Sequence, residues 1–294
     1  WYSGLNSNKC KGTDLLKGVN PASGMVLYYD LPSLSKETEL TLTIKDAQGN
    51  IVNTFSSSVD KSYITYEGNP PKKPTLSKNV GLNRFVWNMH YPLLPGVPEV
   101  YIEGSYSGHQ AIPGNYQLTL TYDDNHFETP AIIQANPLYD LSEAQYRAYH
   151  EFMSFAAATY REMTDMTNRL NEINTKLKSL LAKMNPTNHN ELIALGNSLS
   201  ADLTLWDGIM VQRLSKAYDD VENFENGFTA HYLNLISESN SPIPKITQGS
   251  ESRKVELDTE WIIHKQHAER LLKGQVQFFN TACQAQSVGV LFVE

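Results

Sequence analysis

The chain of 294 residues is 40% hydrophobic and 19% charged, a composition that supports a packed core and excludes wholesale disorder. Its formal net charge of −8 argues against nucleic acid or an anionic membrane as the main partner. No apolar run approaches the roughly 20 residues that a transmembrane helix needs, so we expect no membrane span. The length predicts two domains. Because the chain begins at Trp1 with no initiator methionine or signal peptide, we interpret it as a processed product or a fragment of a longer protein.

Residues 1–23 show no hydrophobic period and are expected to form an irregular lead-in. From Met25 the period becomes two, as in half-buried strands. The predicted strands, about seven or eight in roughly 110 residues, are 25–31, 40–45, 51–55, 62–66, 82–90, 99–103, 116–122 and 127–134. Many short strands without intervening helices are typical of an antiparallel sandwich, so residues 24–136 are predicted to form an immunoglobulin- or fibronectin-like β-sandwich.

After Asn136 the hydrophobic period becomes that of a helix. Ser142 and Gln145 fit a capping box at the start of a first helix. The predicted helices cover about 142–183, 192–214, 227–237 and 257–282. Residues 137–294 are therefore predicted to form a bundle of long antiparallel helices, and the whole chain an α+β protein of two domains. The β-prone end GVLFVE is expected either to add a short strand or to pack back against the rest.

The only two cysteines are Cys10 and Cys283, near opposite ends of the chain. In an oxidising compartment they could form one bridge between the N-terminal segment and the last helix. Two unpaired thiols are the alternative, and the sequence does not distinguish the two states. The spacing excludes a structural zinc site built from cysteine pairs.

The run GLNRFVWNMHYP, residues 81–92, concentrates polar and aromatic side chains on one predicted strand. Alternation places Phe85, Trp87 and Met89 on one face and Arg84, Asn88 and His90 on the other. A large aromatic side chain among alternating apolar residues usually fills a sandwich core. We therefore predict structural roles for Arg84, Trp87 and Asn88, with the polar side chains bonded to neighbouring strands or to the helical half.

The stretch from Pro92 to Gly114 is rich in proline and glycine and carries Tyr101, Tyr106 and His109. Exposed tyrosine rings on a loop suit stacking on a sugar ring or docking on a neighbouring domain. These three residues are the candidate binding residues. Ordinary packing of the loop is the alternative hypothesis.

Metal-ligating and catalytic patterns are weak in this sequence. His264 and His267 have a spacing that can ligate a metal, but no third ligand stands out and an interhelical histidine is the simpler interpretation. The acidic groups Asp123-Asp124 and Asp219-Asp220 with Glu222 lack an EF-hand's oxygen spacing. There is no GxSxG, HExxH or phosphate-binding glycine loop, and no carboxylate pair, Glu99 and Glu103 included, is singled out. We expect no catalytic residue, cofactor or metal.

In chain order, the motifs PASGMVLYYDL, LTIKDAQGNIVNTFSS, GLNRFVWNMHYP and IPGNYQLTLTYDDNHF precede a long helical tail that ends in GVLFVE. This order resembles the C-terminal region of large bacterial sortilin-like proteins with BNR-repeat β-propellers, many of which are labelled glycosyl hydrolases from the propeller alone. The resemblance covers roughly residues 20–294 and is more specific in the strand-rich half than in the helices.

The resemblance implies a β-propeller that precedes this region in the longer protein. No blade repeats or Asp-box turns occur in the chain itself. The family's run usually reads Asn-Arg-Phe-x-Trp-Asp-x-Arg-Tyr-Pro, whereas this chain has Asn88 and His90 in place of the aspartate and arginine. An ion pair between those two positions would be lost, so no charged site is carried over.

These observations predict a non-catalytic, extracytoplasmic region that acts by contact with the propeller or with another cell-envelope protein. The extracytoplasmic location would be the periplasm, the cell surface or the medium. One alternative is an accessory carbohydrate-binding module, with a glycan as partner, of a glycoside hydrolase whose catalytic part lies outside this chain. A third hypothesis is an active hydrolase whose catalytic groups lie in the propeller.

Overall fold

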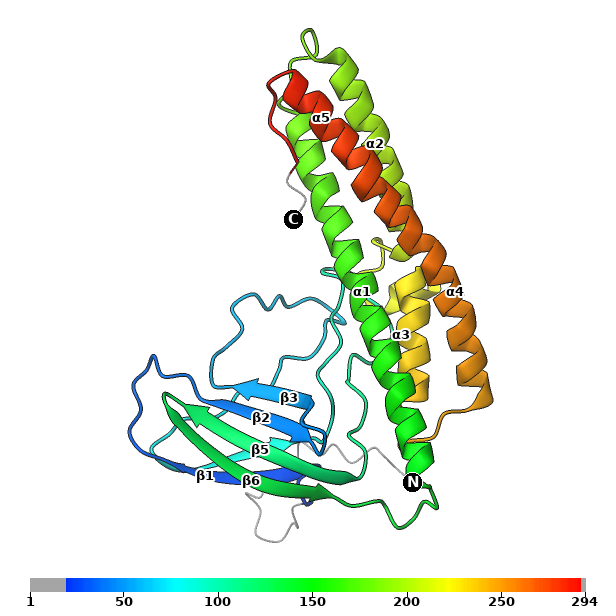
Figure 1. The fold of residues 1–294 in the computed structure, drawn as a ribbon. Helices are drawn as coiled ribbons and strands as arrows, with labels where there is room; N and C mark the ends of the chain where they lie inside the picture. The colour runs from blue at the N-terminus through cyan, green and yellow to red at the C-terminus, as the bar shows by residue number, and fades with distance from the viewer. Residues whose placement is uncertain (1–19, 292–294) are drawn as a thin grey trace. The chain divides into compact units, whose positions relative to one another are not determined.

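The computed structural model describes residues 20–291 and has an α+β fold with antiparallel sheets and long helices, as predicted (Figure 1). The chain divides into two compact units. Within the described range, the sheet unit comprises residues 20–59, 74–90 and 116–131, and the helical unit comprises residues 60–73, 91–115 and 132–291. The expected boundary near residue 136 does not separate these units, because two segments from the first half of the chain belong with the helices.

The sheet unit contains two antiparallel sheets. Strand β1 (Met25–Leu31) pairs with β4 (Gly81–Trp87), so that Met25 lies opposite Trp87 and Leu31 opposite Gly81. The second sheet has the strand order β3-β2-β5-β6. Its strands are β2 (Thr41–Asp46), β3 (Ile51–Ser56), β5 (Gly114–Tyr122) and β6 (Asn125–Ile133). Strands β2 and β4 bury alternate residues, as the period of two predicts, whereas β6 has no buried residue.

The buried faces of the two sheets meet through aromatic side chains. The rings of Phe55 and Phe85 lie 4.8 Å apart between centroids, and those of Trp87 and Tyr116 lie 5.8 Å apart in an edge-on arrangement. Trp87 is fully buried, and its indole N–H donates to the His90 carbonyl at 3.1 Å. The prediction that Trp87 belongs to the core is confirmed.

Strand β4 ends at Trp87, earlier than predicted. Met89 has a φ of 58° and does not continue the alternation. The third buried residue of the strand is Asn83, which sequence reasoning did not select. Its side-chain amide donates to the carbonyls of Asn79 and Gly81, at 2.7 and 2.8 Å, and its Oδ1 accepts from the Ser77 hydroxyl at 2.8 Å. These bonds satisfy the side-chain amide of Asn83 and offset the free-energy cost of burying it.

Two predicted strands, 62–66 and 99–103, are irregular. The backbone of the second stretch bonds to a loop of the helical unit instead of a sheet. The Tyr101 N–H donates to the Ser215 carbonyl at 2.9 Å, and Glu99 has a φ of 59°, which no regular strand accommodates. The described part of the chain therefore holds six strands, fewer than the alternation suggested.

The helical unit begins with α1 (Glu143–Leu181), a helix of 39 residues that is about 58 Å long at 1.5 Å per residue. The predicted capping box is present, with Ser142 and Gln145 each bonded to the other's backbone N–H. The other helices are α2 (Asn190–Met210), α3 (Phe228–Ser239), α4 (Gln248–Arg270) and α5 (Gln277–Ala285), with a short 3-10 turn at Tyr218–Glu222. A π-helical turn, Leu271–Val276, joins α4 to α5 without a break.

Helix α1 contacts α2, α3 and α4 (Figure 1). Helix α2 ends at Met210, because Val211 is extended, so Leu214 is an exposed loop residue and not part of the predicted helical stripe. The last described residues pack back on α5 and form no strand. The Leu291 N–H donates to Asn280 Oδ1, and the Asn280 amide donates to the Leu291 carbonyl, both at 2.7 Å.

Candidate functional site

Residues 91–115, called here the aromatic segment, contain the three predicted binding residues and belong to the helical unit. The segment folds back so that its first residues lie beside its later ones. The Tyr91 N–H donates to the His109 carbonyl at 2.9 Å, and the Leu94 N–H donates to the Tyr106 carbonyl at 2.8 Å. These bonds hold the two arms of the segment together.

Side chains of α1 and α3 hold the aromatic segment in place. The Arg161 guanidinium donates to the carbonyls of Leu93 and Pro92, at 3.0 and 3.1 Å. The Ser105 N–H donates to the Ser237 hydroxyl at 2.9 Å. Bonds from helical side chains to loop backbone satisfy polar groups that an irregular buried segment would otherwise leave unpaired.

Tyr149 of α1 connects three parts of the helical unit. Its hydroxyl accepts from the Gln110 N–H at 3.3 Å and donates to Asn240 Oδ1 at 2.8 Å. The Asn240 amide in turn donates to the Gly108 carbonyl at 3.3 Å. Burial raises the pKa of Tyr149 to about 12, since the phenolate would be desolvated.

The expectation that the candidate binding rings are exposed is wrong for two of the three residues. Tyr106 is 4% exposed and His109 is 3% exposed. Both lie against the helices because the aromatic segment supplies core residues to the helical unit: Leu94, Val97, Val100, Ile102 and Tyr106. Tyr101 is half-buried, and its ring meets that of Tyr218 edge-on at 6.5 Å between centroids. The segment is a packed part of the fold, and ordinary loop packing describes it better than an open binding loop.

A pair of histidines joins the aromatic segment to α1. His109 Nε2 and His150 Nδ1 lie 3.1 Å apart, and the Tyr91 ring stacks on His109 at 4.1 Å with an interplanar angle of 8°. A hydrogen bond between two imidazole nitrogens needs a lone pair on one of them, so at least one ring is neutral while the bond exists. Sequence reasoning missed His150, because nothing in the local pattern of α1 distinguishes it.

The other predicted structural residues lie on β4 and just after it. Arg84 is exposed and lies opposite Tyr28 on the outer face of the β1–β4 sheet. Asn88 is exposed, and its Oδ1 accepts from the His90 N–H at 3.3 Å. The expected bonds from Asn88 to neighbouring strands are therefore replaced by a bond within its own run.

The residues considered as metal ligands make packing contacts and hydrogen bonds within the fold. The His264 ring packs edge-on against Phe228 at 5.0 Å, with its Nε2 3.5 Å from Glu260. Asp220 Oδ2 accepts from the backbone N–H groups of Lys216 and Ala217, at 2.6 and 3.0 Å. Asp123, with a φ of 46°, turns the chain between β5 and β6. Within residues 20–291, no three His, Cys, Asp or Glu side chains are grouped so as to hold a metal ion.

Cys283 of α5 is buried and forms no disulfide with another described residue, and burial raises the pKa of its thiol. Cys10 lies outside the described residues. The predicted bridge between the two cysteines therefore stays a prediction.

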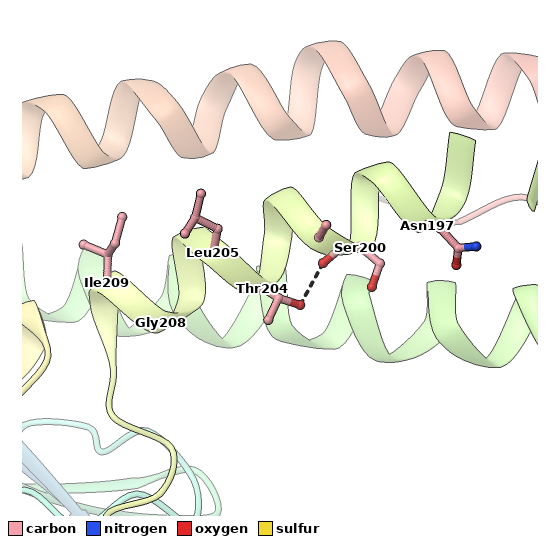
Figure 2. A pocket seen from close by; sticks show the side chains of 7 residues that line it. Asn197, Ser200, Thr204, Leu205, Gly208 and Ile209 are labelled. Carbon is pink, nitrogen blue, oxygen red and sulfur yellow. Dashed lines mark hydrogen bonds between the residues drawn. The ribbon is translucent and has the colours of Figure 1, made fainter. Parts of the chain in front are cut away.

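An open groove of about 810 Å³ runs along one side of α2. Its lining residues are Asn197, Ser200, Ala201, Thr204, Leu205, Gly208 and Ile209 (Figure 2). The Thr204 hydroxyl donates to the Ser200 carbonyl at 2.7 Å, and the Ser200 hydroxyl donates to Asn174 Oδ1 of α1 at 2.7 Å. The hydroxyl groups are thus engaged within the fold, while Leu205 is 65% exposed. With no acidic or basic side chain in its lining, the groove suits apolar contact and not acid–base chemistry.

Among the described helices, none is both long enough and apolar enough to cross a bilayer. No family model, curated protein or solved structure matches this chain.

Proposed function

We propose that the chain is a non-catalytic, extracytoplasmic interaction region of a larger protein, with an immunoglobulin-like sandwich followed by a helical bundle. The order of sequence motifs supports a β-propeller of the same protein, or another cell-envelope protein, as its partner. In this proposal the helical unit is a rigid scaffold, and contact is made through apolar side chains on regular elements.

The observation that carries the proposal is the bonding of the aromatic segment. A catalytic or ligand-binding loop presents polar groups to a cavity, where they meet the ligand. Here the polar groups of three helical side chains bond to the backbone of the aromatic segment: those of Arg161, Tyr149 and Ser237. Burial of Tyr106 adds an aromatic side chain to the core instead of a binding surface. The aromatic segment, which holds the three candidate binding residues, therefore packs as part of the helical unit.

Exposed apolar side chains lie instead on strands and helices. Tyr28 and Leu82 on the β1–β4 sheet are 64% and 73% exposed. Single exposed apolar residues are common, but neighbouring ones on a rigid element suit contact with another protein. This surface supports a contact function.

Hydrolysis assays on a panel of aryl glycosides test the proposal. We expect no turnover by the purified chain. Turnover that a single carboxylate-to-amide substitution abolishes would replace the proposal with a hydrolase. A glycan array tests the carbohydrate-binding alternative, which the burial of Tyr106 and His109 disfavours. Specific glycan binding that Tyr101→Ala removes, with unchanged melting temperature, would favour that alternative over a protein partner.

A further inference from the structure

We infer that the free edge of β1 binds an extended, apolar partner strand that carries a basic residue, by β-sheet augmentation. This inference names the chemistry of the partner and rests on the proposed contact function. It depends on the pairing, composition and burial of β1 compared with the other edge strands.

The β1–β4 sheet has two strands, so within the described residues β1 has a neighbour on one side only. In an antiparallel pair, roughly half of a strand's backbone N–H and C=O groups point to its partner and the rest point away. Over the seven residues Met25–Leu31, the outward-pointing groups form a row that can pair with another extended chain.

The sequence of β1, MVLYYDL, lacks the features that usually protect an edge strand. It contains no proline, glycine or lysine, and Asp30 is its one charged residue. By contrast, β6 carries Glu128 and Pro130. At β3, the Leu76 N–H donates to the Ser56 carbonyl at 2.9 Å and covers part of that edge.

The inner layer of the sheet unit is incomplete at β1. Phe85 and Trp87, which face inward from β4, are at most 6% exposed. Met25 and Leu27 alternate with exposed residues and face the same layer, yet both remain partly exposed. An added strand with large apolar side chains at alternate positions would cover Met25 and Leu27. The inward-facing residues of β4 are already covered, so this gain in burial is available at the β1 edge and not at the β4 edge.

Charge and area indicate which strand fits. Asp30 is exposed on β1, so a basic side chain beside it is favoured. A single strand buries less than the roughly 1,600 Å² of a standard interface, so it binds weakly unless it is tethered or already assembled beside its site. A strand of an attached or co-assembled domain meets this condition. A second copy of the chain is a less suitable partner, because each copy has a formal net charge of −8 and the two copies repel each other.

The probe for this site is a fluorescent peptide with the sequence of residues 80–88, VGLNRFVWN, which includes β4 and one arginine. Titration of the full chain should give weak, saturable binding by fluorescence anisotropy. Hydrogen exchange should show added protection of β1 amides, with β4 still protected and β6 unchanged.

Two N-methylated peptides make the test specific for backbone pairing. One carries N-methyl groups at Leu82, Arg84 and Val86, and the other at Asn83, Phe85 and Trp87. Because only one set of amides can face β1, one peptide should bind at least about tenfold more weakly and the other like the parent.

In the protein, Leu27→Lys should abolish binding, since an inward lysine blocks an added strand. Val26→Lys, on the outer face, should change it less than about threefold. The methylated peptides decide the question even if Leu27→Lys does not fold.

The inference is overturned by absence of saturation up to about 1 mM peptide, by equal affinity of the two methylated peptides, or by protection outside β1. It is also overturned if β1 becomes protected in concentrated protein without peptide, because the occupant would then be a second copy. None of these outcomes bears on glycoside hydrolysis. If the inference about β1 fails, the proposed non-catalytic role is still tested separately by the hydrolysis assays.

Discussion

At the scale of single residues, Trp87 is the strongest test of the sheet unit. Its side chain is fully buried and contacts Tyr116 of the other sheet. We expect Trp87→Ala to lower the free energy of unfolding by about 3–5 kcal/mol, because burial is lost and a cavity remains. Urea unfolding measures the change, with the exposed Leu82→Ala as control, expected within about 0.5 kcal/mol. Equal unfolding midpoints for Trp87→Ala and the parent would contradict the observed burial.

Two tyrosines predict how the stability of the helical unit depends on pH. Burial raises the pKa of both Tyr66 and Tyr149 to about 12 from the usual 10. The stabilisation is therefore complete below pH 10. Between about pH 10 and 12 the unfolded phenols ionise while the folded ones stay neutral, so stability falls as pH rises.

Alkaline titration followed by circular dichroism checks this expectation. The Tyr149→Phe variant should lose stability less steeply in this range, whereas the exposed Tyr28→Phe should behave like the parent. A parent chain whose unfolding midpoint in urea is constant from pH 9 to 12 would contradict the expectation.

At the scale of elements, two glycines on α2 give opposite predictions. A Cβ on Gly196 would lie 2.5 Å from Leu181 Cδ2 and 3.0 Å from Phe279 Cε2, whereas one on Gly208 would meet nothing within 4 Å. We expect Gly196→Ala to destabilise the protein by about 1–3 kcal/mol through overpacking. Gly208→Ala should be neutral or stabilising by up to about 1 kcal/mol, since alanine favours helix. Thermal unfolding of the two variants measures both effects, and similar melting temperatures would contradict the close packing of α2.

In the whole molecule, the aromatic segment contributes to the core of the helical unit. Leu94, Val97 and Ile102 are buried in its core although they precede the helices by more than thirty residues. We therefore expect a fragment of residues 137–294 to melt at a lower temperature than the full chain and to bind a hydrophobic dye, because the surface under the segment is exposed. A fragment that melts like the full chain and binds no dye would show that the helices are self-sufficient.

Elements whose pattern is local could be predicted from the amino-acid sequence alone. The alternation at 25–31 gave β1 with its observed bounds, and the capping box at Ser142 located the start of α1. The burial of Trp87 also followed from alternation. These features depend on neighbours within a few residues along the chain, which a sequence displays directly.

The sequence could not show that the stretches at 62–66 and 99–103 join no sheet, or where the aromatic segment lies, because both depend on contacts between residues far apart in the chain. Their alternation is compatible with a strand, but the partner of Tyr101 is Ser215, more than a hundred residues away. The same holds for the candidate site, where Tyr106 and His109 are buried by helices and His150 pairs with His109 from a different element. Polarity and loop composition cannot show such burial, because it depends on which distant surfaces cover a segment.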